Sequence, residues 1–215
     1  MTNRARKGKK TKDEPQLEFN GLHLEVFPDV YFPHEDSFLL AEAAEKHAFG
    51  KVLDLGCGSG IAGISAAKNG KAESVTFADI SKQAIENAAL NCKLNLIPSP
   101  IHFILTDLFS MLKNERFDTI LFNPPYLPTS SEEKLRGELN LAFDGGKTGR
   151  KIIDRFLPEF GRHLEKGGVL LYLHSSLTND GITSGFLKAH HFKTGKISSQ
   201  RFFFEEIAAL KITGP

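Results

Sequence analysis

From residue 35 onward, short apolar runs alternate with segments in which apolar residues recur every three or four positions. Runs of four or five residues rich in β-branched and aromatic side chains predict buried strands, whereas the longer spacing predicts amphipathic helices. The predicted strands are residues 52–55, 74–78, 101–105, 119–122, 169–173, 193–198 and 203–212. The predicted helices are 35–46, the segment from the glycine cluster to 69, 81–91 with Ser81 as its N-cap, 150–164 and 180–189.

This alternation predicts an α/β fold built on a seven-stranded, mostly parallel, doubly wound sheet with helices on both faces. The last two strands are close enough in the chain to pair as an antiparallel hairpin. The chain has no internal repeat and no linker that would divide it. We therefore expect one domain over residues 15–215, preceded by a disordered basic tail at 1–14.

The segment Asn123-Pro124-Pro125-Tyr126 directly follows the strand predicted at 119–122. Two consecutive prolines cannot donate to a sheet ladder, so the chain must leave the sheet at Asn123. The Asn123 side-chain oxygen and the Pro124 carbonyl can accept from both hydrogens of a planar –NH2 group, and Tyr126 can stack on its flat face. The alternative is an ordinary Asn-Pro turn with a buried tyrosine.

A glycine cluster after the first strand indicates a ligand site. Gly56, Gly58 and Gly60 lie between the strand at 52–55 and a helical segment, an arrangement that lets a ligand approach the backbone closely. The same residues also match a dinucleotide-binding pattern. The glycines alone do not choose the cofactor.

Three aspartates narrow the choice. Asp54, Asp79 and Asp107 each stand at or just after the end of one of the first three predicted strands. A pyrophosphate would be repelled by Asp54, whereas a cationic sulfonium or ammonium group would be attracted. Asp79 can accept from two ribose hydroxyls and Asp107 from an adenine amine, so the three acids together match S-adenosylmethionine. A solvated turn acid is the alternative for each one separately.

Several segments resemble known proteins: 54–60, 106–109, 123–126, 30–40, 143–150 and 204–208. Together they resemble the HemK-related, S-adenosylmethionine-dependent glutamine methyltransferases in their short archaeal and eukaryotic form. The resemblance implies a Rossmann-like class I methyltransferase fold. It also implies a cofactor site of Ser37, Ile80, Leu108 and Asn123 beside the acids and glycines.

In this family the substrate is the glutamine of the Gly-Gly-Gln loop of class-1 translation release factors. The resemblance therefore implies catalytic roles for Asn123, Pro124 and Tyr126, and a substrate site that also includes Pro125. An amine of a nucleic-acid base (adenine or guanine) and a protein lysine remain alternative substrates. A non-catalytic cofactor-binding scaffold and a nucleotide-dependent oxidoreductase are the other classes to weigh. Substrate specificity is expected in the loop 127–149.

The short form of the family implies a separate, small zinc-binding activator subunit. The strand at 101–105 is expected at one edge of the sheet, and it is apolar and uncharged. Natural edges are normally blunted by Lys, Pro or a covering element, so a bare edge favours pairing with another chain. We expect the activator to bind at this edge.

Charge and composition limit the remaining possibilities. The first 12 residues hold six Lys or Arg; without them the basic count falls from 27 to 21 against 26 acids, which argues against a nucleic-acid cleft. No apolar stretch reaches the length of a membrane helix, about 18 residues. Two cysteines and scattered histidines predict a reduced, metal-free, cytoplasmic protein.

Overall fold

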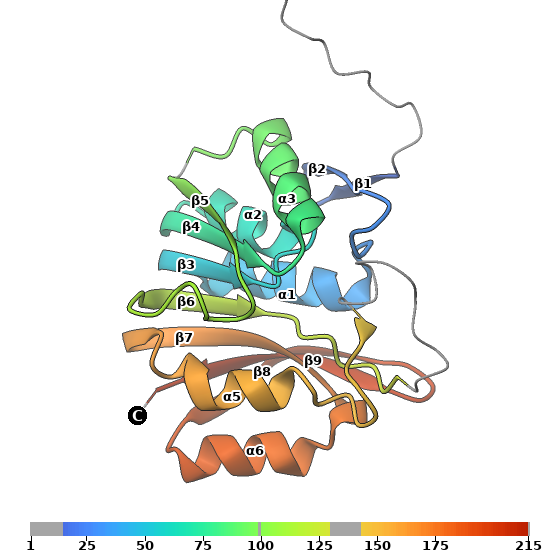
Figure 1. Ribbon diagram of the computed structural model, residues 1–215, viewed down its shortest axis with the longest axis vertical. Coiled ribbons are helices and arrows are strands. Elements are labelled where there is room, and N and C mark those ends of the chain that lie inside the picture. The colour runs from blue at the N-terminus through green and yellow to red at the C-terminus, as the bar shows by residue number, and fades with distance from the viewer. Residues whose placement is uncertain (1–14, 99, 130–142, 215) are drawn as a thin grey trace, which may run out of the picture.

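The computed structural model describes residues 15–98, 100–129 and 143–214. Its centre is a seven-stranded sheet in the order β5-β4-β3-β6-β7-β9-β8 (Figure 1). The strands are β3 (Gly50–Leu55), β4 (Ala72–Asp79), β5 (Ile101–Leu105), β6 (Phe117–Phe122), β7 (Leu164–Ser175), β8 (Lys193–Arg201) and β9 (Glu206–Thr213). Strands β5, β4, β3, β6 and β7 are parallel, and β9 pairs antiparallel with both β7 and β8. The expected mixed sheet with an antiparallel C-terminal hairpin is confirmed.

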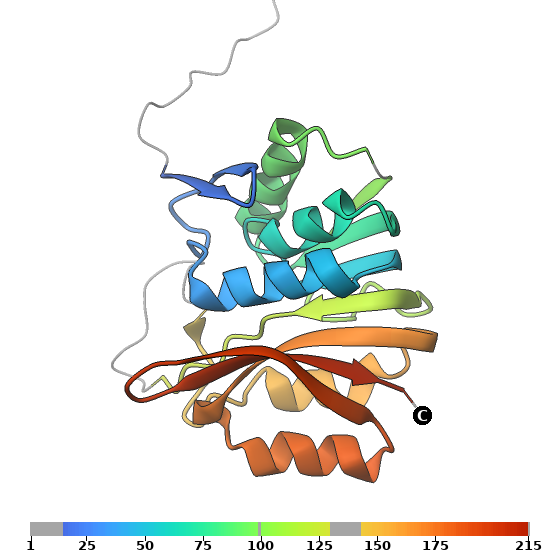
Figure 2. The same cartoon turned by 180° about the vertical axis from the view of Figure 1, so that it is seen from behind.

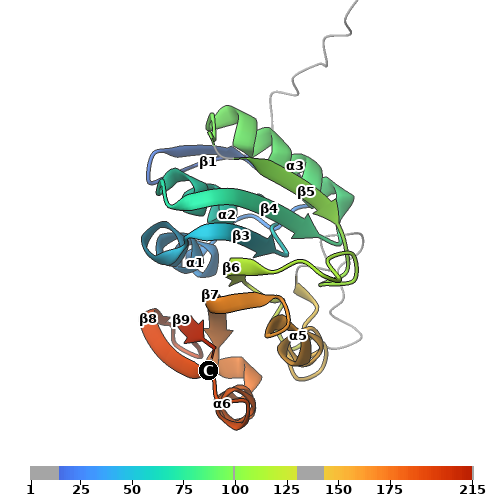
Figure 3. The same cartoon turned by 90° about the vertical axis from the view of Figure 1, so that its left-hand side faces the viewer.

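Helices cover both faces of the sheet (Figure 3). The helices α1 (Glu35–His47), α2 (Ile61–Lys68) and α3 (Lys82–Leu94) lie on one face, and α5 (Ile153–Phe160) and α6 (Asp180–Ala189) lie on the other. Successive strand residues point to opposite faces, so Val52 joins the first core and Leu53 the second. Burial on both faces explains why the central strands β3 and β6 end in continuous apolar runs rather than alternating ones.

The largest boundary differences from the expectation are at α5 and β7. The helix expected at 150–164 is the shorter α5, and β7 begins at Leu164, before the predicted start at 169. The sequence Glu165-Lys166-Gly167-Gly168 carries no strand signal, and these residues lie in the register irregularity between the Phe117–Leu164 and Thr119–Val169 pairs of β6 and β7. The pair at Leu164 therefore places the start of β7 before the apolar run that the sequence showed.

The last strand also starts later than expected, at Glu206 rather than at 203. Phe202, Phe203 and Phe204 have high strand propensity, but they form the connection between β8 and β9. The backbone N–H of Phe202 donates to the carbonyl of Glu205 at 2.7 Å, which closes the turn.

The strands β1 (Gln16–Phe19) and β2 (Leu22–Glu25) form a hairpin that the sequence analysis missed. Asn20 and Gly21 both have positive φ in its two-residue turn, and Asn-Gly between alternating apolar residues is the signal that could have predicted it. The basic tail expected at 1–14 lies outside the described residues.

Helix α3 lies beside this hairpin (Figure 2). Three asparagines, on α3 and at its C-cap, hold the hairpin through a ladder of hydrogen bonds. The side-chain oxygens of Asn95, Asn91 and Asn87 accept from the backbone N–H groups of His23, Glu25 and Phe27 at 3.0, 2.9 and 3.1 Å. Four helical residues rise about 6 Å and two strand residues about 6.6 Å, so the two spacings match. The ladder fixes the chain that leads to Val30 and Tyr31.

Candidate active site

A cavity of about 310 Å³ opens where β3, β4 and β6 end. Among the predicted site residues, all except Gly60 line it: Ser37, Asp54, Gly56, Gly58, Asp79, Ile80, Asp107, Leu108, Asn123, Pro124, Pro125 and Tyr126. The carboxyl ends of parallel strands meet at one edge of a sheet, which is why residues so far apart in the chain surround one space.

The glycines serve two different purposes. Gly58 has φ +51°, and a Cβ there would meet no atom of the described residues within 4 Å, so the backbone at this point leaves room in the cavity. Gly60 has φ +84°, and its Cβ would lie 3.0 Å from Cβ of Ala88. Gly60 therefore allows α2 to pack closely against α3 instead of lining the cavity.

Asp54 is a buried carboxyl group at the end of β3. Its Oδ2 accepts from the backbone N–H of Gly63 at 2.9 Å. Burial raises the pKa of Asp54, the hydrogen bond from Gly63 lowers it and the charge of Asp79 raises it, so that the resulting pKa is about 7. Because this pKa lies near 7, a cation placed beside the carboxyl group would shift it to its ionised form at neutral pH.

The other two predicted acids are held by different partners. Asp79 accepts from the backbone N–H of Gly58 at 3.0 Å and of Ser81 at 2.8 Å, one with each oxygen. Asp107 forms an ion pair with Arg155 at 2.8 Å, and Arg155 also lines the cavity. The sequence analysis missed Arg155, which lies 48 residues along the chain and belongs to no recognisable motif.

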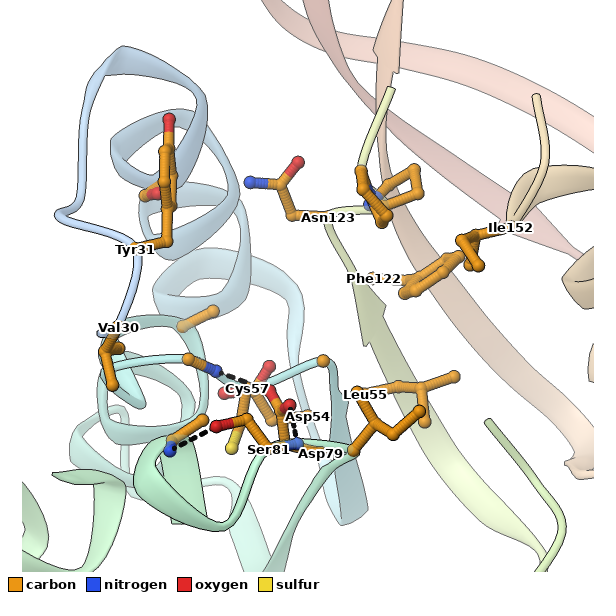
Figure 4. Close-up of a pocket in the computed structure, with 18 of the residues that line it drawn as sticks. Val30, Tyr31, Asp54, Leu55, Cys57, Asp79, Ser81, Phe122, Asn123 and Ile152 are labelled. Carbon is orange, nitrogen blue, oxygen red and sulfur yellow. Dashed lines mark hydrogen bonds between the residues drawn. The ribbon is translucent and has the colours of Figure 1, made fainter. Parts of the chain in front are cut away.

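Asn123 is fixed by Asp36, a buried residue in the first turn of α1. Nδ2 of Asn123 donates to Oδ2 of Asp36 at 3.0 Å. A carboxylate can only accept, so this bond determines which way the Asn123 amide faces. Oδ1 of Asn123 is buried and has no hydrogen-bond partner among the described residues. In Figure 4, Asn123 and Tyr31 lie at one end of the view, and Asp54, Asp79 and Ser81 lie together at the other.

Two tyrosine hydroxyls also donate to Asp36. Tyr31 donates at 3.1 Å to Oδ1 and Tyr126 at 3.5 Å to Oδ2. Burial raises the pKa of both phenols, and the negative charges of Asp36 and Glu205 raise it further, so both hydroxyls stay protonated at neutral pH. Asp36 also accepts from the backbone N–H of Ser37 at 2.6 Å.

The backbone of Tyr126 packs closely against the glycines of the segment 143–150. A Cβ on Gly149 would lie 2.2 Å from the Tyr126 carbonyl oxygen, and one on Gly145 would lie 2.7 Å from the Leu127 carbonyl oxygen. The backbone N–H of Gly145 donates to that Leu127 oxygen at 3.1 Å. Of the loop expected to set specificity, residues 130–142 lie outside the described residues.

Two searches over the described residues gave negative results. In residues 15–98, 100–129 and 143–214, no group of three or more His, Cys, Asp or Glu side chains could hold a metal ion. No helix in the same ranges is both long and apolar enough to cross a membrane.

Comparison with known proteins identifies the family. The profile of the methyltransferase small domain matches residues 33–138. A Methanocaldococcus jannaschii protein assigned as a protein N5-glutamine methyltransferase is 43% identical over 194 residues, which cover 90% of this chain and 96% of that protein. The chain belongs to the HemK-related protein N5-glutamine methyltransferases. Family membership confirms the expected cofactor, S-adenosylmethionine, and the expected activity, N-methylation of a protein glutamine.

Other relatives match this chain over part of their length. The release factor glutamine methyltransferase of Gloeobacter violaceus is 31% identical over 69% of this chain, which spans only 55% of that protein. Human methyltransferase HEMK2 is 35% identical over 62% of this chain and 65% of its own length.

The fold agrees with solved class I methyltransferases. The structure of the E. cuniculi Mtq2-Trm112 complex, which methylates the termination factor eRF1, matches with a TM-score of 0.65 and 23% identity over 87% of this chain and 99% of the matched one. The M. jannaschii tRNA m1G37 methyltransferase gives the same TM-score, with 22% identity over 96% of this chain and 56% of its own. The common fold therefore does not distinguish protein from RNA substrates.

Proposed function

We propose that this methyltransferase modifies the side-chain amide of the glutamine in the Gly-Gly-Gln loop of a class-1 translation release factor. The main support is Oδ1 of Asn123, which is buried and has no hydrogen-bond partner within the described part of the chain, and the Asp36 bond that sets the direction of this amide. A buried acceptor without a partner carries a desolvation penalty of about 1–3 kcal/mol, which a substrate N–H can relieve. The names of several 31–33% identical bacterial relatives support the release factor as substrate.

The chain's own residues account for the activation of the amide. An amide nitrogen is a weak nucleophile because its lone pair is delocalised into the carbonyl. Asn123 Oδ1 and the Pro124 carbonyl would accept from its two hydrogens, which orients the lone pair toward the methyl donor, while Tyr126 would lie against the amide plane. Once methylated, the nitrogen is acidic and would release one of these two hydrogens as a proton to water. Such positioning contributes up to about 7–11 kcal/mol to lowering a barrier.

The cofactor would occupy the end of the cavity formed by the glycine turn and the acids. Asp79 would accept from the ribose hydroxyls, Asp54 would face the cationic part, and Ile80 and Leu108 would contact the base. The bound cofactor supplies an electrophilic methyl group on a sulfonium sulfur. Carboxylates at these positions suit a cationic ligand and disfavour the pyrophosphate of a dinucleotide.

The direct test is methyl transfer to purified proteins of the same organism. With S-adenosylmethionine, the release factor should gain one methyl group at the glutamine of its Gly-Gly-Gln loop, located by fragmentation mass spectrometry. A release factor with that Gln replaced by Asn is the control and should remain unmodified. One relative is named a ribosomal protein uL3 glutamine methyltransferase, so uL3 is the competing substrate. Methylation of uL3 in place of the release factor would overturn the proposal.

We also propose that a small zinc-binding activator subunit pairs with the free edge of β5. Within the described residues β5 is the terminal strand of the sheet and pairs only with β4. Leu105 is 53% exposed and Met111 is 69% exposed beside this edge. The E. cuniculi relative Mtq2 is found in a complex with Trm112. A bare edge with exposed apolar side chains is a surface for strand addition.

Leu105 is the position that tests the edge. Ile101 and Phe103 are less suitable, because Ile101 packs against the core and the Phe103 ring stacks on Phe77 at 5.4 Å. Leu105→Lys should abolish co-purification with the activator while the isolated chain keeps its circular dichroism spectrum. Ile182→Lys, at a comparably exposed position on α6, should retain the complex. An intact complex with the Leu105 variant would exclude this edge.

A further inference from the structure

The turn between β8 and β9 exposes two aromatic rings. Phe203 is 92% exposed and Phe204 is 85% exposed. The two rings contact each other edge to face, with centroids 4.7 Å apart, and among ring contacts between described residues each pairs only with the other. Leaving one phenylalanine in water rather than burying it forgoes about 1.5–3 kcal/mol. The folded chain therefore gains little from these two rings.

The turn is rigidly attached at its base. Oγ of Ser175, at the end of β7, donates to Oε1 of Glu205 at 2.6 Å, and the backbone N–H of Glu206 donates to Oγ of Ser176 at 3.0 Å. Arg201 and Lys196 form ion pairs with Glu206 across the hairpin. The exposed rings are thus carried on a well-anchored hairpin and not on a loose loop.

The turn also lies beside the active site. The charge of Glu205 contributes to the raised pKa of both Tyr31 and Tyr126, which line the cavity. Figures 1 and 2 show the β8–β9 turn at the same end of the sheet as the carboxyl ends of β3 and β6, where the cavity opens. A side chain that enters the cavity must bring its own main chain and neighbouring residues to this rim.

We infer that Phe203 and Phe204 form a docking surface for the folded domain of the substrate protein that carries the glutamine. The inference rests on the proposed function. The surface that contacts these rings is an apolar patch of the substrate protein next to the glutamine loop. Aromatic side chains exposed on a fixed support are typical of the residues that dominate protein interfaces. The rings lie next to the reacting site, so they recognise the protein around the glutamine and not the glutamine itself.

The test compares a folded substrate with a peptide. In the double variant F203S/F204S, KM for the intact release factor should rise about 10- to 100-fold, the range expected on removing two interface aromatics. The kcat/KM for a short Gly-Gly-Gln peptide should stay within about twofold of that of the unchanged enzyme, since docking residues outside the cavity do not touch the peptide. Calorimetric affinity for S-adenosylmethionine should also be unchanged. Ile182→Ser, at an exposed apolar position on α6, is the matched control and should leave both substrates unaffected.

Two results would overturn the inference. The first is equal KM for the intact release factor in the double variant and the unchanged enzyme. The second is a loss of self-association in the double variant by analytical ultracentrifugation, which would assign the rings to a second copy of this chain. The proposed function fails separately, if the unchanged enzyme does not methylate the release factor at all. An active enzyme with an unaffected double variant would remove only the docking surface.

Discussion

Nδ2 of Asn123 donates to Oδ2 of Asp36 at 3.0 Å, across 87 positions of the chain, and this bond sets the direction of the Asn123 amide. Asp36→Asn should leave the orientation of the Asn123 amide less well fixed, because an amide at position 36 can donate as well as accept. We expect kcat to fall by about 10²-fold, the scale of losing one preorganised hydrogen-bond partner, with S-adenosylmethionine affinity kept. The measurement is steady-state kinetics together with calorimetry.

A double-mutant cycle separates positioning from general damage. Asn123→Ala alone should lower kcat by about 10³-fold, because the acceptor itself is removed. If Asp36 acts through Asn123, Asp36→Asn should have little further effect in the Asn123→Ala background. Fully additive losses would show that Asp36 acts on something other than Asn123.

Cofactor affinity should rise with pH through neutrality. The pKa of Asp54 is about 7 in the free protein, and a nearby cation favours the ionised form, so binding releases a proton below that pH. The dissociation constant for S-adenosylmethionine should decrease about tenfold between pH 6 and pH 8. Isothermal titration at the two pH values measures this, and Asp54→Asn should flatten the dependence. A steep dependence that survives in Asp54→Asn would assign it to another group.

The same group affects stability with the opposite trend. Asp54 has a folded pKa above its unfolded value, so the folded state binds the extra proton between about pH 4 and pH 7. Its contribution to the free energy of unfolding is fully present below about pH 4 and is lost as pH rises through 7. In urea titrations at pH 5 and pH 8, Asp54→Asn should gain stability relative to the unchanged protein at the higher pH.

Gly149→Ala should distort the active site. Its φ is +71°, and the new Cβ would lie 2.2 Å from the Tyr126 carbonyl oxygen, so the Tyr126 backbone must move. Strain of this kind costs of order 1–3 kcal/mol, and we expect both the melting temperature and kcat to fall. Gly185→Ala in α6 is the matched control: its Cβ meets nothing, and it should stabilise the helix by about 0.5–1 kcal/mol.

The asparagine ladder should be uneven in energy. Asn91 is fully buried and bonds the backbone N–H and carbonyl of Glu25 and the carbonyl of Ser59. Asn91→Ala leaves buried backbone groups without partners and should lower the free energy of unfolding by about 2–4 kcal/mol. Asn95→Ala removes similar bonds to His23 near the surface, where water replaces them, and should lower it by less than about 1 kcal/mol. Chemical denaturation of both variants compares them.

The hydrophobic pattern alone predicted most of the sheet, because strands buried on both faces must be apolar throughout. The same pattern placed Asp54, Asp79 and Asp107 at strand ends, and in a parallel sheet those ends share one edge. The pattern failed at the β8–β9 turn, where strand propensity placed Phe203 in β9 and pairing with β7 and β8 left it exposed. Local preference is weak compared with the register that a whole sheet imposes.

Tertiary structure decided which side chains meet. Neither the Asp36–Asn123 bond nor the Asp107–Arg155 ion pair can be read from the chain, since each joins residues from separate elements whose orientation depends on packing. The sequence by itself identified the segment from Asn123 to Tyr126 as a site for an –NH2 group, and it identified the strand end that presents this segment. Only the folded chain determined the direction of the Asn123 amide, because α1 must first pack across the sheet before a carboxylate can fix it.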